Sequence, residues 1–185
     1  AGLVADGVWK SNATMVNQNG VTVSGPVRRQ PLTDDINLVS YMRWPEGFSI
    51  SGIAFSGVIY DGSAIWFVPY YADRVVRLDK RTGEMKGFIG WPAGYVRVAM
   101  AFLGGVFDEG DGEPSIWLIP FSADRVIRLF TTNGTMIGDN NTWPAGVNGA
   151  APRKFVGGVD DGEHIWMSPH YANCVLRLNK RNYNR

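Results

Sequence analysis

This chain of 185 residues has little of several features that identify common protein classes. It holds one cysteine, Cys174, so no disulfide can form within the chain and its stability must come from packing. No apolar run reaches the roughly 18 residues of a membrane-spanning helix, so we expect no membrane span. A sustained apolar period of 3.6 residues is also missing, which predicts almost no helix.

Neither strong charge nor a catalytic motif is present. The net charge is +1, and the basic doublets are scattered instead of forming a stripe, so we expect no nucleic-acid partner. There are two histidines, and no nucleophile elbow, zinc-protease motif or phosphate-binding loop. The acidic run at 108–113 lacks the spacing of an EF-hand and is interpreted as a solvated turn, with calcium binding as the alternative. The sequence therefore predicts no cofactor, no metal site and no enzymatic activity.

What the chain does have is repetition, and all seven tryptophans take part in it. One frame, G-V-x-D followed by I-W-x-x-P-x-x-A-(D/N)-x-V-x-R-L, occurs three times. A second frame, W-P-x-G, also occurs three times. The tryptophans of the first frame are Trp66, Trp117 and Trp166, those of the second are Trp44, Trp91 and Trp143, and Trp9 stands in a degenerate copy of the first.

The period of the repeat predicts the architecture. A repeat of about 40–50 residues indicates a propeller, a solenoid or an array. Within each copy, short apolar and β-branched runs such as 65–68 and 75–78 are separated by Gly, Pro, Asn and Asp, which is the pattern of strands and turns. Four short strands per repeat make one propeller blade. We predict an all-β protein, a β-propeller of about four blades built from four-stranded repeats of about 47 residues.

The repeat resembles those of YVTN, NHL and streptogramin-lyase-type β-propeller proteins, through D-G-x-x-I-W-x-x-P-x-x-A-(D/N)-x-V-x-R-L followed by W-P-x-G. The resemblance covers residues 45–185 clearly and 1–43 faintly, and it implies a propeller architecture. Streptogramin-type lyases use a histidine and a carboxylate. A small propeller lyase or hydrolase, with His170 and Glu163 as the acid–base pair, is therefore an alternative function.

We predict one domain over residues 1–185, made of a degenerate unit and three regular units. The last unit stops before its outer strand, and residues 20–25 could supply a missing strand. Alternatively, the chain assembles with another chain or belongs to a longer array, so self-assembly is a possible interaction. The predicted units are 1–43, 44–90, 91–142 and 143–185.

Two sets of recurring residues are interpreted as structural. The tryptophans of the I-W step are expected in the core between stacked blades. The recurring arginine needs a partner if it is buried, and the recurring aspartate is the expected partner in an ion pair. The predicted pairs are Asp61 with Arg77, Asp108 or Asp111 with Arg128, and Asp161 with Arg177.

An aromatic face is the candidate binding site. The W-P-x-G loops and the P-x-x-A loops are expected to emerge on the same face of a propeller, where rings could bind sugars, Pro-rich peptides or protein surfaces. The alternative is that the W-P-x-G tryptophans only join neighbouring blades. The predicted ligand-binding residues are Trp44, Trp91, Trp143, Tyr70, Tyr71, Phe121, His170 and Tyr171.

Three N-glycosylation sequons begin at Asn12, Asn133 and Asn140. They favour secretion. The chain begins at Ala1, which suggests either a removed leader or a fragment of a larger protein. We predict an extracellular or cell-surface glycoprotein that acts as a non-enzymatic, lectin-like binding module for carbohydrate or protein. The alternative is a structural subunit of a surface assembly, filament or larger repeat array.

Overall fold

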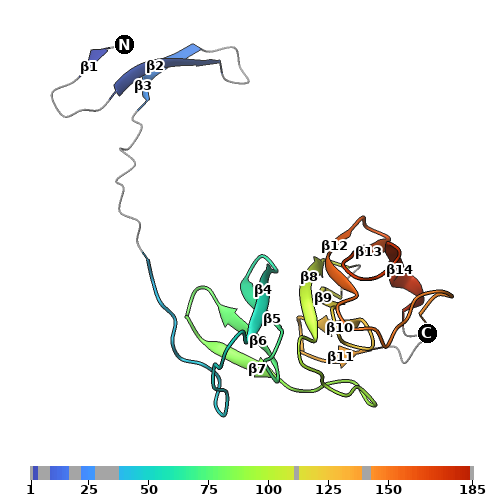
Figure 1. Cartoon of the computed structure of the whole chain (residues 1–185). Helices are drawn as coiled ribbons and strands as arrows, with labels where there is room; N and C mark the ends of the chain where they lie inside the picture. The colour runs from blue at the N-terminus through green and yellow to red at the C-terminus, as the bar shows by residue number, and fades with distance from the viewer. Residues whose placement is uncertain are drawn as a thin grey trace. The chain divides into compact units, whose positions relative to one another are not determined.

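The chain, seen in a computed structural model, forms two compact units, Ala1–Ser40 and Tyr41–Arg185 (Figure 1). Each unit is described by itself, and the single domain predicted from the sequence stays a prediction. The structure describes the three strands of the first unit and residues 38–110, 113–138 and 143–183.

The first unit contains an antiparallel sheet of three strands in the order β1-β2-β3. β1 (Gly2–Leu3) pairs with the start of β2 (Trp9–Val16), and β2 pairs along most of its length with β3 (Thr22–Val27). This sheet lies in the region for which the sequence predicts a degenerate repeat unit.

The second unit contains three antiparallel sheets, called blades 1, 2 and 3, in which strands that follow each other in sequence are neighbours (Figure 1). Blade 1 is β4 (Phe55–Tyr60), β5 (Ala64–Pro69), β6 (Val75–Asp79) and β7 (Met85–Phe88); blade 2 is β8 (Phe102–Asp108), β9 (Ser115–Pro120), β10 (Ile127–Phe130) and β11 (Met136–Ile137); blade 3 is β12 (Phe155–Asp160), β13 (His164–Pro169) and β14 (Leu176–Asn179). The predicted all-β propeller class and its four-stranded repeat are confirmed, and each blade lies within one predicted regular unit.

The second strand of each blade is the apolar I-W run, and it ends at the proline of the P-x-x-A frame. Proline ends the run because it has no N–H to give to a ladder. All six residues of β9 are buried, whereas β5 and β13 contain partly exposed positions. Within the described residues the only helix is one 3₁₀ turn, η1 (Lys180–Asn182).

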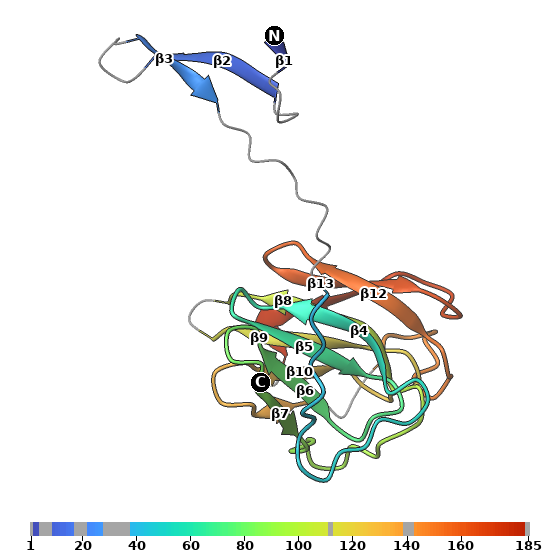
Figure 2. The same cartoon turned by 90° about the vertical axis from the view of Figure 1, so that its left-hand side faces the viewer.

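The first strands, β4, β8 and β12, lie side by side (Figure 2), and glycine lets them approach closely. A Cβ atom added to Gly105 would lie 2.5 Å from Cδ1 of Ile59 in blade 1. A Cβ atom added to Gly158 would lie 3.0 Å from Cδ1 of Ile119 in blade 2. The same register position in blade 1 is occupied by Val58, which pairs with the residue after the I-W tryptophan as both glycines do.

Two apolar cores join the blades, and burial of this kind of surface is the main source of fold stability. The first includes Ile59, Trp66 and Val68 of blade 1 with Phe102, Leu118 and Leu129 of blade 2, and the second includes Val106, Trp117 and Ile119 of blade 2 with Phe155, Ile165 and Met167 of blade 3. Trp66 and Trp117 are 1% and 0% exposed, which confirms their predicted core role. Trp166 is only half-buried, because it lies on the face of blade 3 that turns away from blade 2.

The predicted ion pairs between the recurring Asp and Arg are wrong for the described residues, which do not include Asp111, because the tryptophan stands between the two. In blade 1, Oδ2 of Asp61 accepts a hydrogen bond of 2.6 Å from Nε1 of Trp66, and the guanidinium of Arg77 lies 5.8 Å from the centre of the indole. The corresponding distances are 3.1 and 5.0 Å in blade 2 and 2.6 and 5.5 Å in blade 3. A carboxylate thus holds the edge of each indole, and a cation covers its face.

Candidate functional site

One end of the second unit is formed by the P-x-x-A loops, and each loop is fixed by carbonyl groups of the segment that enters its blade. In blade 1 the carbonyl of Ala54 accepts hydrogen bonds from the N–H groups of Tyr70, Tyr71 and Ala72, at 2.9, 3.1 and 3.0 Å. The carbonyl of Ala101 accepts the same three bonds in blade 2. In blade 3 the carbonyl of Lys154 accepts from the N–H groups of His170 and Ala172, and the N–H of Tyr171 donates to the carbonyl of Arg153. The loops cover residues 70–74, 121–126 and 170–175.

The same backbone positions also link each blade to the next. The N–H of Ala101 donates to the carbonyl of Tyr70 at 3.0 Å, and the N–H of Lys154 donates to the carbonyl of Phe121 at 2.7 Å. Blades 1 and 2 therefore each receive one backbone hydrogen bond from the blade that follows them at this end. The side chains of the three loops are held in a fixed relation by this chain of bonds.

Five of the predicted ligand-binding residues form a continuous aromatic band across the three loops. The ring centres are 5.1 Å apart for Tyr71 and Tyr70, 6.0 Å for Tyr70 and Phe121, 5.3 Å for Phe121 and His170, and 4.6 Å for His170 and Tyr171. These separations fall within the range of interacting aromatic pairs. We call Tyr70, Tyr71, Phe121, His170 and Tyr171 the aromatic band.

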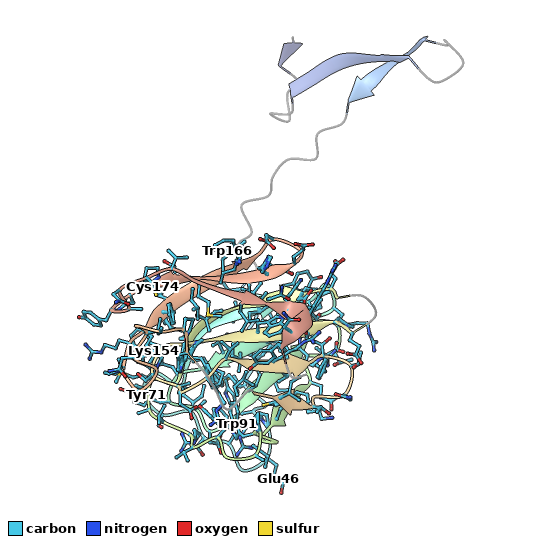
Figure 3. The ribbon with its side chains drawn as sticks, turned by 90° about the vertical axis from the view of Figure 1, so that its right-hand side faces the viewer. Glu46, Tyr71, Trp91, Lys154, Trp166 and Cys174 are labelled. Atoms are coloured by element: carbon cyan, nitrogen blue, oxygen red, sulfur yellow. The ribbon has the colours of Figure 1, made fainter. Side chains whose placement is uncertain are left out.

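The aromatic band is buried at its middle and open at its two ends. Phe121 is 5% exposed, whereas Tyr71 is 46% and Tyr171 is 69% exposed. Figure 3 shows Tyr71 on the same side of the unit as Lys154, the residue that anchors the third loop. The band is therefore supported by the core at its centre and offers two accessible tyrosine rings.

A polar hollow of about 260 Å³ lies beside Tyr71. The hydroxyl groups of Ser49 and Ser51, the carboxylate of Asp73 and the guanidinium of Arg97 all line it. Arg97 donates a hydrogen bond of 3.4 Å to the carbonyl of Tyr71, which ties the hollow to the aromatic band. A hydrogen bond from Arg74, with the charges of Arg74 and Arg97, keeps the pKa of Asp73 below its ordinary value, so the carboxylate is charged at neutral pH.

The sequence did not single out the polar residues of this hollow. They come from the segment before blade 1, from its P-x-x-A-D loop and from the segment that leads to blade 2. The sequence feature that could have indicated this hollow is the recurring Asp after P-x-x-A. The predicted ion pairs involved a different Asp, that of the G-V-x-D frame.

The W-P-x-G tryptophans have their rings on core phenylalanines. Trp91 stacks on Phe102 at 6.0 Å, and its Nε1 donates to the carbonyl of Asp73 in the preceding blade at 3.0 Å. Trp143 stacks on Phe155 at 5.9 Å, and its Nε1 donates to the carbonyl of Asp124 at 2.8 Å. These contacts join neighbouring blades, as the structural alternative expects, and ligand binding by these rings stays a prediction.

Trp44 repeats half of this arrangement. Its ring stacks on Phe55 at 5.8 Å and contacts Phe48 and Phe67. Within the described part of the chain, its Nε1 atom donates no hydrogen bond. Its place as a predicted ligand-binding residue, like those of Trp91 and Trp143, is untested.

Lys154 is a buried charge that the repeat pattern does not predict, since Ala54 and Ala101 hold the same position in the other blades. Its side chain is 1% exposed, and Nζ donates to the carbonyl of Ala151 at 2.8 Å. The ammonium lies 5.5 Å from the centre of the Trp143 indole. Burial lowers the pKa of Lys154 to about 8, because no carboxylate among the described residues pairs with it.

The remaining candidate residues are placed as follows. Asn133 is exposed in the turn between β10 and β11, where its Oδ1 accepts a hydrogen bond of 2.8 Å from the N–H of Thr135. Asn12 lies in β2, and Asn140 lies outside the described residues. In the part of the chain that the structure describes, no cluster of His, Cys, Asp and Glu could hold a metal ion, and no helix is long and apolar enough to cross a membrane.

The comparisons with known proteins identify structures but no family. No family model and no curated protein matches the chain. The chain is similar to the extracellular domain of the one-component system BT4673 from B. thetaiotaomicron, with 14% identity and a TM-score of 0.47 over 72% of this chain and 16% of that one. It is also similar to virginiamycin B lyase from Staphylococcus aureus, with 13% identity and a TM-score of 0.47 over 97% of this chain and 51% of that one. A streptogramin B lyase structure is 17% identical, with a TM-score of 0.37 over 63% of this chain and 37% of that one.

Proposed function

We propose that the chain is a non-enzymatic binding module that takes carbohydrate on the aromatic band and in the polar hollow beside it. The observation that carries the proposal is the contact of five rings from three separate loops, ending in two exposed tyrosines. Structural needs alone explain a buried ring such as Phe121. They do not explain Tyr71 and Tyr171, whose exposed rings add little to the core.

The chemistry of the hollow favours carbohydrate over a Pro-rich peptide or a protein surface. A sugar has an apolar C–H face and a rim of hydroxyl groups, so it needs an aromatic ring beside both donors and acceptors. Tyr71 supplies the ring, Asp73 supplies acceptors, and Arg97 supplies donors within one hollow. A Pro-rich segment needs aromatic grooves and fewer charged partners.

An extracellular or cell-surface location belongs to the same proposal. Asn133 is exposed in a turn, which is the setting in which a glycan can be attached and carried. The two other sequons add weight from the sequence alone. A glycoprotein with a sugar-binding face outside the cell is a coherent combination.

The lyase or hydrolase alternative gains no support from the arrangement of its candidate pair. His170 follows one end of β13 and Glu163 precedes the other. A strand of six residues is about 20 Å long, so the two side chains cannot act on one atom. The ring of His170 is instead packed between Phe121 and Tyr171.

The experiment is a screen of soluble oligosaccharides, followed by calorimetric titration of any sugar that binds. Replacing Tyr71 or Tyr171 by Ala should weaken binding at least about tenfold, because each removes a stacking ring at an open end. Tyr60→Ala is the matched control, since Tyr60 is 48% exposed at the end of β4, at the opposite end of blade 1. Equal losses in Tyr60→Ala and Tyr71→Ala would refute the site, and binding of Pro-rich peptides without sugars would assign it to a protein ligand.

A further inference from the structure

Blade 3 has an open face built from the same positions that are buried between the other blades. Val159 is 60% exposed, whereas its counterparts Ile59 and Val106 are 8% and 9% exposed. Val175 is also 60% exposed, and its counterparts in blades 1 and 2 are buried. Figure 3 shows Trp166 of this face at the margin of the second unit. The face therefore has the shape of a blade interface without a blade upon it.

Blade 1 has the complementary open face. Ile65 and Phe67 are partly exposed, although the residues at the same positions in blades 2 and 3 are fully buried against the preceding blade. Val58, on the same face, is 61% exposed. The two open faces are thus the two halves of one repeating interface.

The polar groups at the two faces are also complementary. Two hydrogen bonds recur at both closed interfaces, one from the N–H before the first strand to a loop carbonyl and one from a tryptophan Nε1 to a second loop carbonyl. On blade 3 the matching acceptors are the carbonyl groups of His170 and Asn173. On blade 1 the matching donors are the N–H of Ala54 and Nε1 of Trp44. Within the described residues, none of these four groups has a hydrogen-bond partner.

The side-chain volumes at the two faces compensate each other. At the closed interfaces, Cδ1 of an isoleucine reaches a glycine of the next blade. The open face of blade 1 has Val58 in place of that glycine. The open face of blade 3 has Val159 and Ser168 in place of the isoleucines, and both are shorter. A larger residue on one face is met by smaller residues on the other, and such volume-conserving exchanges are the ones that packing tolerates.

We propose that blade 3 of one copy packs on blade 1 of a second copy and that the second copy returns the same contact. The closed pair would contain six blades, within the range of four to eight that propellers use. His170 of one copy would then contact Tyr70 of the other, so the aromatic band would continue around the ring. The contact does not depend on the proposed sugar binding, and its test measures mass alone.

The test measures the mass of the purified full chain by sedimentation and native mass spectrometry over a range of concentrations. We expect a species of two copies of the 20.4 kDa chain that dissociates on dilution. Val58→Glu and Val159→Lys should each weaken association at least about tenfold, because each leaves a charge in an apolar contact. Val96→Glu is the control, since Val96 is 74% exposed and lies on neither face. The circular dichroism spectrum should be unchanged in all three variants.

The double variant Val58→Glu, Val159→Lys provides the decisive comparison. The two positions meet only between copies, so opposite charges there should restore the association that each single change weakens. A single-copy mass at all concentrations up to about 100 μM would overturn the proposal, as would association that neither single change weakens. A double variant no better than the single ones would also reject this contact.

Discussion

Blades 2 and 3 have the same sequence frame, but among the described residues of the second unit only blade 2 is covered on both faces. Trp117 of blade 2 is 0% exposed between two cores, whereas Trp166, with the same hydrogen bond to an aspartate and the same arginine over its ring, is half-buried. The comparison separates what the frame does within a sheet from what the neighbouring sheets add. The local Asp–Trp–Arg arrangement forms in both blades, so it does not require coverage.

Replacing the tryptophan by alanine in each blade should produce the largest difference between them. Trp117→Ala should lower the free energy of unfolding by about 3–5 kcal/mol, because it leaves a cavity between two blades. Trp166→Ala should lower the free energy of unfolding by about 1–2 kcal/mol, since folding buries a smaller part of the surface of this ring. Urea titrations of dilute protein measure both values, and equal losses would show that coverage by a second blade contributes nothing.

Lys154, at the entry to blade 3, gives a second test of how the blades differ in stability, because blades 1 and 2 have alanine at this position. Its pKa of about 8 lies below the ordinary value of 10.5, so between these pH values the unfolded chain binds more protons than the folded one. Stability should therefore rise as the pH increases from 8 to 10.5. Lys154→Met should remove this rise and stabilise the protein at pH 7 by at most about 3.5 kcal/mol, at about 1.4 kcal/mol per pKa unit.

The control for Lys154 is Lys86→Met, which removes an exposed lysine that also lies near an aromatic ring. The pH dependence of its unfolding should match that of the parent protein. If Lys154→Met kept the parent's rise in stability above pH 8, the rise would have to come from another group.

The fold could be predicted because each copy of the repeat encodes the same short strands. Each I-W run ends at a proline, and each blade falls within a predicted unit, because turn residues and apolar runs act over a few neighbours. Blade 3 has three strands within the described residues, in agreement with the prediction that the last unit stops before its outer strand. The exposure of its outer face could not be predicted, because it depends on which surfaces meet in space, and the frame is the same whether a face is covered or open.

The site was predicted in part, for a related physical reason. The P-x-x-A aromatics lie together as expected, since equivalent loops of adjacent blades must be neighbours. The ion pair predicted for the Asp of the G-V-x-D frame was wrong. An indole N–H and a guanidinium are both possible partners of a carboxylate, and the sequence does not show which one is chosen. Lys154 and the polar hollow were missed because their neighbours come from separate segments.

The smallest difference in stability is expected between variants of Asp108 and Asp161, whose carboxylates accept the hydrogen bonds of Trp117 and Trp166. Burial raises the pKa of Asp108, but hydrogen bonds from Lys180 and Trp117 outweigh it, and the net pKa is lowered. The pKa of Asp161 is lowered by hydrogen bonds from Trp166 and from backbone N–H groups. Each group therefore adds stability above about pH 4, the ordinary value for Asp, and loses it as the pH falls.

Lys180 makes these two carboxylates unequal, and this difference is the measurable one. Its Nζ lies 2.9 Å from Oδ1 of Asp108 in blade 2 and 2.7 Å from Oδ2 of Asp160 in blade 3, so it joins the two blades. Asp108→Asn leaves Lys180 with one partner, and Asp161→Asn affects only contacts within blade 3. Both variants should unfold with a weaker dependence on pH below 4, but only Asp108→Asn should be clearly less stable at pH 7. Equal stability at pH 7 would mean that the ion pair between the blades adds nothing to what each aspartate does for its own tryptophan.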